Sequence, residues 1–250
     1  MVQWALAPSL LTTWERAYGL SPVQRGLALL SLARPRDAVE QLANWTIGER
    51  DASLLDFRSS LFGTGIESVA ACPECSEKLE VSFQVGDIRL VDAPAPKAQT
   101  LRIDSHSAIL RPLTSADLLA VERQPSARLR REVLLSRCVT IPDAGPISES
   151  DSAELKSTNW SDEAQRAIAD LLAEIDPQAD IRISLDCSRC NHAWSSRFDI
   201  TTHLWSEVDV WAQRMLAEVH ALAFAYGWSE RDILAMTPWR RQLYMGMLRR

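Results

Sequence analysis

The sequence has no apolar run that approaches the roughly 20 residues a helix needs to span a bilayer. Its first residues, Met1-Val-Gln-Trp-Ala-Leu, also lack the basic start of a secretory signal peptide. Cysteine is scarce, with 5 in 250 residues, and nothing in the chain indicates export, so disulfides are not expected. We therefore expect a cytoplasmic protein in a reducing environment.

The chain also has fewer basic than acidic residues. The 27 Lys and Arg residues stand against 33 Asp and Glu residues, which gives a net charge of -6. Binding to phosphate groups needs a concentrated basic surface, so unspecific nucleic-acid binding is not expected as the main role.

Enzyme signatures are missing too. The sequence has no H-E-x-x-H, no G-x-x-x-x-G-K phosphate loop, no G-x-S-x-G elbow and no dinucleotide fingerprint. Carboxylates such as Asp199 and Glu207 are scattered, and capping or solvation explains each more simply. The sequence therefore predicts a protein without enzymatic activity.

What the chain does have is two cysteine pairs of one local form, Cys72-Pro-Glu-Cys75 and Cys187-Ser-Arg-Cys190. Two such C-x-x-C turns complete the tetrahedral shell of one structural zinc ion, with no position left for water or substrate. A redox dithiol and unligated cysteines remain alternatives, although a redox pair usually opens a helix and both pairs here precede strands. His192 would be an alternative ligand, but four thiols make it unnecessary. The fifth cysteine, Cys138, belongs to an apolar helix stripe and is expected in the core.

The residues after each pair predict a strand. Leu79, Val81, Phe83 and Val85 alternate with polar residues after Cys75, and Trp194, Phe198 and Ile200 follow Cys190 at corresponding offsets. Two such hairpins form a zinc ribbon. Zinc pairs are usually separated by fifteen to twenty residues, whereas residues 76–186 intervene here, so the ribbon must be split by an inserted module.

The rest of the chain is predicted to be mostly helical. The expected fold class is α+β, with the following parts: an N-terminal helical bundle over 1–65, the split ribbon over 66–90 with 181–200, an inserted helical module with a β-hairpin over 91–180, and a C-terminal segment over 201–250. Expected helices are Pro8–Tyr18, one capped by Ser21, Asp37–Trp45, Glu49–Phe62, Ser115–Arg123, Ser126–Val139, Ser161–Ile175, Thr201–Tyr226, one capped by Ser229 through Met236, and one starting at Thr237-Pro238. The stretches Asp92–Pro96 and Pro142–Asn159 are expected to be a stiff linker and a mobile polar segment.

The C-terminal segment carries a further pattern. Gly227 permits a chain reversal that brings Tyr226 and Trp228 over a helix junction, and no acid follows Asp232. This end is locally basic, and a solvated helix face and a contact for an acidic partner both remain open. The candidate partner-binding residues are Tyr226, Trp228, Trp239, Arg240, Arg241 and Tyr244. His203 and His220, on the long helix, are expected to be solvated or capping residues and not metal ligands.

One C-terminal stretch is the string His220-Ala-Leu-Ala-Phe-Ala-Tyr-Gly-Trp-Ser-Glu-Arg-Asp-Ile-Leu-Ala-Met, followed by Pro238-Trp-Arg-Arg-Gln-Leu-Tyr244. It resembles a signature of the baseplate hub-assembly proteins of T4-like phages, with relatives in contractile tails and contractile injection systems. The resemblance extends more loosely to Trp45-Thr-Ile-Gly-Glu-Arg-Asp-Ala-Ser-Leu-Leu, Leu61-Phe-Gly, both C-x-x-C pairs, Asp176-Pro177, Phe198-Asp-Ile and Leu204-Trp205.

The resemblance implies a non-enzymatic factor that helps assemble the hub or baseplate. Such a factor is either a minor part of the particle or a chaperone absent from the finished one, and its partners are baseplate, hub or spike proteins. The leading hypothesis is thus a zinc-stabilised assembly or structural protein, cytoplasmic or incorporated in a particle. The alternative is a zinc-ribbon regulator that binds nucleic acid, for which Arg189 and the terminal arginines are the support.

Overall fold

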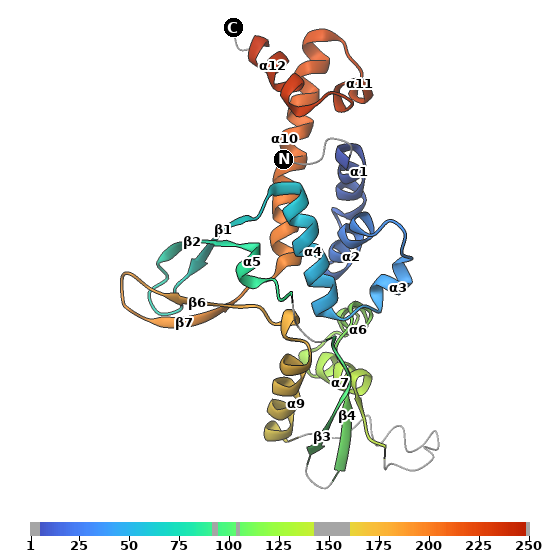
Figure 1. Cartoon of the computed structure of the whole chain (residues 1–250), viewed down its shortest axis with the longest axis vertical. Helices are drawn as coiled ribbons and strands as arrows, with labels where there is room; N and C mark the ends of the chain where they lie inside the picture. The colour runs from blue at the N-terminus through green and yellow to red at the C-terminus, as the bar shows by residue number, and fades with distance from the viewer. Residues whose placement is uncertain (1–5, 92–94, 104–105, 143–160, 249–250) are drawn as a thin grey trace.

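The computed structural model describes residues 6–91, 95–103, 106–142 and 161–248. One long helix near the C-terminus runs along the molecule, and two hairpins project from its side (Figure 1). The expected fold class is confirmed: the chain is a mostly helical α+β protein with small hairpins, clustered cysteines and a long C-terminal helix. The division into four parts stays a prediction.

From residue 6 onward, four helices precede the first hairpin: α1 (Ala7–Ala17), α2 (Pro22–Ala33), α3 (Val39–Ala43) and α4 (Ile47–Phe62). Helix α2 begins with the predicted capping box, in which Ser21 and Gln24 each accept a hydrogen bond from the other's backbone N–H. Thr46 and Glu49 form a second box, so α4 starts before the predicted Glu49.

Helix α10 (Ile200–Tyr226) is the element against which α1, α2 and α4 pack. Its buried Leu204 and Val208 join a core that contains Leu30 and Leu54. Asp199 caps it, as the sequence predicts, by accepting from the Thr201 backbone N–H at 2.9 Å.

Two long-range polar contacts fix α10 to its neighbours. Trp14 Nε1 donates to Asp209 at 2.8 Å, and Arg58 donates from Nε and Nη2 to the Glu207 carboxylate at 2.9 and 2.6 Å. Glu207 is therefore not the solvated or capping residue expected from the sequence. It is one half of a bidentate ion pair that joins α4 to α10.

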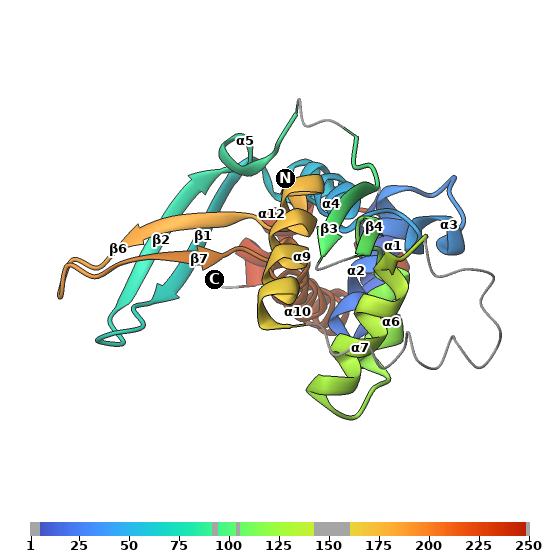
Figure 2. The same cartoon turned by 90° about the horizontal axis from the view of Figure 1, so that it is seen from below.

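The two hairpins form separate antiparallel sheets. Strand β1 (Gly65–Ala71) pairs with β2 (Lys78–Gln84), and β6 (Arg182–Asp186) pairs with β7 (Ala193–Arg197). The short helix α5 (Val85–Ile88) follows β2. Strand β1 continues from α4, and β7 leads into α10, so the bases of the hairpins are anchored in the central helices (Figures 1 and 2).

In its described residues the inserted segment contains a small sheet and three helices. The strands are β3 (Gln99–Ile103), β4 (His106–Leu110) and β5 (Val139–Thr140); the helices are α6 (Ser115–Glu122), α7 (Ala127–Cys138) and α9 (Asp162–Ile175), followed by the 3-10 turn η2 (Pro177–Ala179). Helix α7 ends one residue before the predicted Val139, because Val139 pairs with Leu110. Cys138 is buried, as expected. The predicted linker Asp92–Pro96 and mobile stretch Pro142–Asn159 lie largely outside the described residues.

The inserted segment rests on the start of α4. The Gly48 backbone N–H donates to Asp176 Oδ2 at 2.9 Å, and the Ile47 N–H donates to the Leu113 carbonyl at 2.9 Å. A Cβ atom at residue 48 would collide with the Asp176 carboxylate, so this contact requires glycine. Burial raises the pKa of Asp176 despite the hydrogen bond from Gly48.

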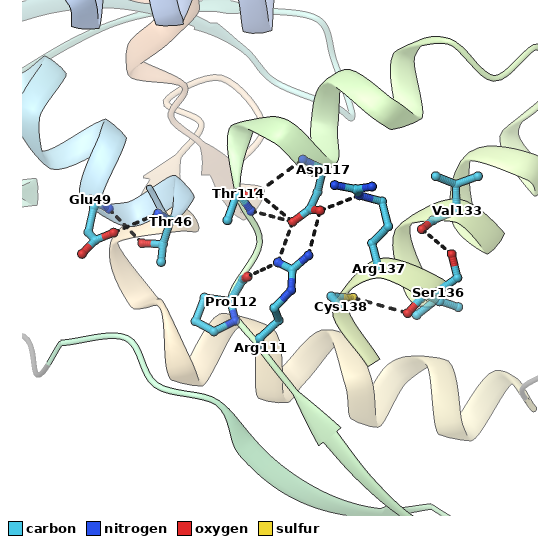
Figure 3. A network of polar contacts seen from close by, with 11 residues as sticks. Thr46, Glu49, Arg111, Pro112, Thr114, Asp117, Val133, Ser136, Arg137 and Cys138 are labelled. Atoms are coloured by element: carbon cyan, nitrogen blue, oxygen red, sulfur yellow. Dashed lines mark hydrogen bonds and ion pairs between the residues drawn. The ribbon is translucent and has the colours of Figure 1, made fainter. Parts of the chain in front are cut away.

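A buried carboxylate holds α6, α7 and β4 together (Figure 3). Asp117 is fully buried and accepts two hydrogen bonds from Arg111, one from Arg137, and two from the backbone N–H and hydroxyl of Thr114. Burial opposes its charge, but the hydrogen bonds from Arg111, Arg137 and Thr114 hold the pKa of Asp117 well below its usual range.

The chain ends in two shorter helices. Gly227 adopts φ 68°, the left-handed conformation that ends α10. Ser229 caps α11 (Glu230–Leu234), which stops two residues before the predicted Met236. Thr237 precedes α12 (Pro238–Leu248) and accepts from the Arg240 backbone N–H at 3.3 Å.

We predict that Gly48→Ala destabilises the protein by roughly 2 kcal/mol, because the added methyl group displaces Asp176 and breaks its buried hydrogen bond. Urea unfolding measures the change. Gly19→Ala is the matched control, since a Cβ there meets no atom within 4 Å. Equal stability of the two variants would contradict the contact.

Asp117→Asn is expected to cost roughly 3 kcal/mol at neutral pH, because two arginines lose their carboxylate partner. The folded-state pKa lies below the unfolded one, so the stabilisation is complete above about pH 5 and is lost as the pH falls through about 3.9 and below. Urea unfolding from pH 7 to pH 3 should show the gap between wild type and variant narrowing toward acid. A gap independent of pH would refute this assignment.

Candidate metal centre

Each cysteine pair lies in the turn of one hairpin, and the two turns have the same backbone structure. The Cys72 N–H donates to the Glu77 carbonyl and the Ser76 N–H to the Cys72 carbonyl, both at 2.9 Å. Cys187, Asn191 and His192 repeat these two bonds at the same distances. The two C-x-x-C pairs, which share one local form in the sequence, therefore also share one turn structure.

The residue after each second cysteine has a left-handed backbone. Ser76 has φ 58° and Asn191 has φ 57°. Asparagine adopts this region more readily than most residues, whereas serine does so at some cost. The left-handed residue turns the chain back so that both sulfurs of a pair face the same side.

The two hairpins lie side by side (Figures 1 and 2). The four sulfurs meet between their turns. All four Sγ atoms lie within 4.8 Å of one another. Cys72 and Cys190 are 3.7 Å apart, and Cys75 and Cys187 are 3.5 Å apart. A tetrahedral ion with sulfur ligands at about 2.3 Å requires sulfurs about 3.8 Å apart. The four cysteines are thus positioned to bind one metal ion.

The sulfur spacing agrees with metal binding, whereas the four thiols differ in pKa: desolvation and hydrogen bonds with neighbouring thiols raise the pKa of Cys75 and Cys190. A disulfide requires sulfurs about 2 Å apart, and all five cysteines are free. Hydrogen bonds from the backbone N–H groups of Cys190 and Arg189 hold the pKa of the Cys187 thiol down at about 7. The thiolate is the form that binds a metal, so these N–H groups favour the ligand state.

The hairpins have few other contacts with each other. Near the hairpin bases, the rings of Phe83 and Phe198 pack edge to face with their centroids 5.3 Å apart. Near the turns, Arg189 Nη1 donates to Glu77 Oε2 at 3.0 Å. Between these points lies a cavity of about 260 Å³ lined by residues that include Ala70, Val81, Ile183 and Leu185. The sulfur cluster is therefore the main link between the ends of the two hairpins.

The histidines lie outside this cluster. His192 stacks on Trp194 at 6.0 Å and is not one of the grouped ligands. His220 is exposed, as expected, and lies beside Phe224. His203 is neither solvated nor capping: it is half-buried against Phe198, with Nε2 3.6 Å from Glu207.

All six candidate partner-binding residues lie in the C-terminal tip, which comprises residues 220–248, and four of them contact one another. The rings of Tyr226 and Trp228 stack with their centroids 4.5 Å apart, and the Tyr244 ring contacts both edge to face. The guanidinium of the exposed Arg240 lies over the Tyr244 ring, with Cζ 5.9 Å from the ring centroid. Trp239 is 73% exposed.

Arg241 departs from the expected exposed position. Its side chain is buried, donates to Glu218 at 3.1 Å and to the Met236 carbonyl at 2.7 Å, and so joins α12 to α10. Sequence periodicity gave no signal for this pair, because Glu218 lies on another helix. Arg241 therefore stabilises the packing of α12 on α10 and is not part of the exposed surface of the tip.

A four-cysteine shell closes the coordination sphere of its ion, so it holds chain segments together and leaves no position for a substrate. Among the described residues, no other group of three or more His, Cys, Asp or Glu side chains is arranged to hold a metal. In the same part of the chain, none of the helices combines the length and apolar character needed to cross a bilayer.

Comparison with protein-family models identifies the T4 bacteriophage base plate protein family over residues 34–202. The match covers more than half of the chain and includes both cysteine pairs, Gly48 and Asp176, so the chain belongs to this family. It ends before the C-terminal string from His220 to Tyr244, on which the sequence resemblance was most specific. Neither the curated proteins nor the solved structures gave a match to this chain.

We predict that Cys72→Ser and Cys187→Ser each abolish metal binding and cause aggregation. A structural metal contributes on the order of 10 kcal/mol of apparent binding free energy, which exceeds the net stability of most domains. Elemental analysis and light scattering of protein purified without chelators measure both effects. Cys138→Ala is the control, since its thiol is buried elsewhere, and it should retain the metal. Wild-type protein without bound metal would refute the ligand set.

Proposed function

We propose that this chain is a non-enzymatic, zinc-stabilised assembly or structural factor for the baseplate or hub of a contractile phage tail or injection system. The observation that carries the proposal is the family match over residues 34–202, which includes the closed four-cysteine cluster. Family membership supports tail proteins as partners, and the closed shell supports a structural role for the metal.

Zinc is the ion that this site suits best. Thiolate ligands favour soft or borderline metals, and a closed tetrahedral set of four cysteines is typical of structural zinc. Zinc held there would fix Cys72 and Cys75 of one hairpin to Cys187 and Cys190 of the other. The hairpins would then form one rigid arm on the central helices, because two-stranded sheets are marginally stable alone.

The C-terminal tip is the proposed contact surface for partners. Its aromatic cluster of Tyr226, Trp228 and Tyr244 and the exposed Trp239 and Arg240 are residue types that often carry binding energy. Arg241 contributes by fixing α12 to α10. The nucleic-acid alternative has less support, because Arg189 is already paired with Glu77.

The test is co-purification of the full-length chain with hub, baseplate and spike proteins encoded in the same genome. We expect one zinc per chain by elemental analysis and a stable complex with at least one tail protein on size exclusion. Cys72→Ser should lose both. Mass spectrometry of finished particles then separates a component, which is retained, from a chaperone, which is absent.

Two results would refute the proposal. One is zinc-loaded wild-type protein that binds none of the individually purified tail proteins. The other is a salt-sensitive complex with DNA or RNA at physiological ionic strength in place of a tail-protein complex.

A further inference from the structure

Helix α12 has two apolar faces, and α10 covers one of them. The inner face carries the buried Arg241, with Tyr244 and Met245 packed against the cluster of Met215, Val219 and Leu222.

The outer face carries Trp239, Leu243 and Met247, which are 73%, 45% and 59% exposed. These three residues follow one another at intervals of four, so they form one stripe along the helix. We call this stripe the outer stripe.

The outer stripe is not an instance of the scattered apolar residues that every surface has. Within the described residues, four of the fifteen exposed large apolar side chains lie on the 11-residue helix α12: Trp239, Leu243, Met247 and Leu248. Exposed apolar groups that gather on one element mark interaction surfaces.

The charged residues on α12 itself, Arg240 and Arg241, are both basic, and Glu218 of α10 pairs with the buried Arg241. Arg240 is exposed beside Trp239, and the sequence contains no Asp or Glu after Asp232. Arg249 and Arg250 follow α12 in the sequence. This end is therefore basic on a chain whose net charge is -6.

We propose that the outer stripe docks into an apolar groove with an acidic rim on a partner protein. The inference rests on the proposed function, because it takes the partner to be a tail protein. An amphipathic helix that lays residues at steps of four into a groove is a recurring recognition mode, and Trp is frequent among residues that dominate binding. Acidic groups on the rim complement Arg240 and attract the basic helix before contact.

A second copy of the chain is a poorer occupant of this surface. Two α12 helices packed together would bring basic ends and like charges into contact, which is repulsive. A bilayer surface is also poorer, because the three apolar residues of the stripe on one short helix offer little apolar area to insert between lipid headgroups.

The experiment uses the full-length, metal-loaded chain and the purified tail protein that binds wild type most tightly. We expect Leu243→Glu to weaken this binding at least about 30-fold, because it places a carboxylate in the apolar groove of the partner, at the central residue of the outer stripe. Arg240→Glu should weaken it about tenfold and reduce its salt dependence, since a rim charge is reversed. Calorimetry or surface plasmon resonance at several salt concentrations measures both.

Leu129→Glu is the matched control, because Leu129 is a leucine of similar exposure, 39%, on the distant helix α7. It should bind as wild type does. Metal content and circular dichroism confirm that each variant is folded, and Met247→Glu replaces Leu243→Glu if that variant does not fold. A photo-crosslinker at position 247 should attach to a partner peptide that combines apolar residues with Asp or Glu.

The outcomes separate the two proposals. Unchanged binding by both Leu243→Glu and Arg240→Glu overturns the docking surface and leaves the proposed function intact. Failure of wild type to bind any tail protein overturns both. A wild-type dimer in ultracentrifugation that Leu243→Glu dissociates, or binding to phosphatidylglycerol vesicles that it abolishes, overturns the partner-groove assignment.

Discussion

The meeting of four cysteine sulfurs at the ends of two hairpins is the constraint on which the rest of this structure depends. Each hairpin is a two-stranded sheet, and such sheets are marginally stable alone. The hairpins touch at Phe83 and Phe198 near their bases, and a cavity separates them further out. An ion held by all four sulfurs closes this gap. Because β1 continues from α4 and β7 leads into α10, the closed arm also restrains the two central helices.

Buried carboxylates organise the body below this arm. Asp176 accepts from the Gly48 N–H and seats the end of the inserted segment on α4, and Asp117 gathers two arginines between α6, α7 and β4. The charge of Asp117 is tolerable because Arg111, Arg137 and Thr114 use its hydrogen-bonding capacity, whereas burial raises the pKa of Asp176 despite the bond from Gly48. These contacts explain why residues far apart in sequence, all within the family match over 34–202, belong to one folded unit.

The chain thus combines residues 34–202, which match the family, with a C-terminal tip that lies beyond the match. The matched part is held together by its core, its ion pairs and its four-cysteine site. The tip supplies exposed aromatic and basic groups on a helix that Arg241 and Glu218 fix in place. The proposed contact surface thus lies apart from the four-cysteine site.

The sequence by itself determined most of the helices and strands and singled out the four cysteines that cluster. Capping boxes, alternating strand residues and C-x-x-C spacing are local signals. They predicted the cap at Ser21, the strand around Val81 and the four candidate ligand cysteines. The tertiary structure alone decided what depends on distant partners: the convergence of sulfurs across residues 76–186, the pairing of Glu207 with Arg58, and the burial of Arg241 against Glu218. No local periodicity records which charges from separate helices will meet, because packing of the whole chain sets those distances.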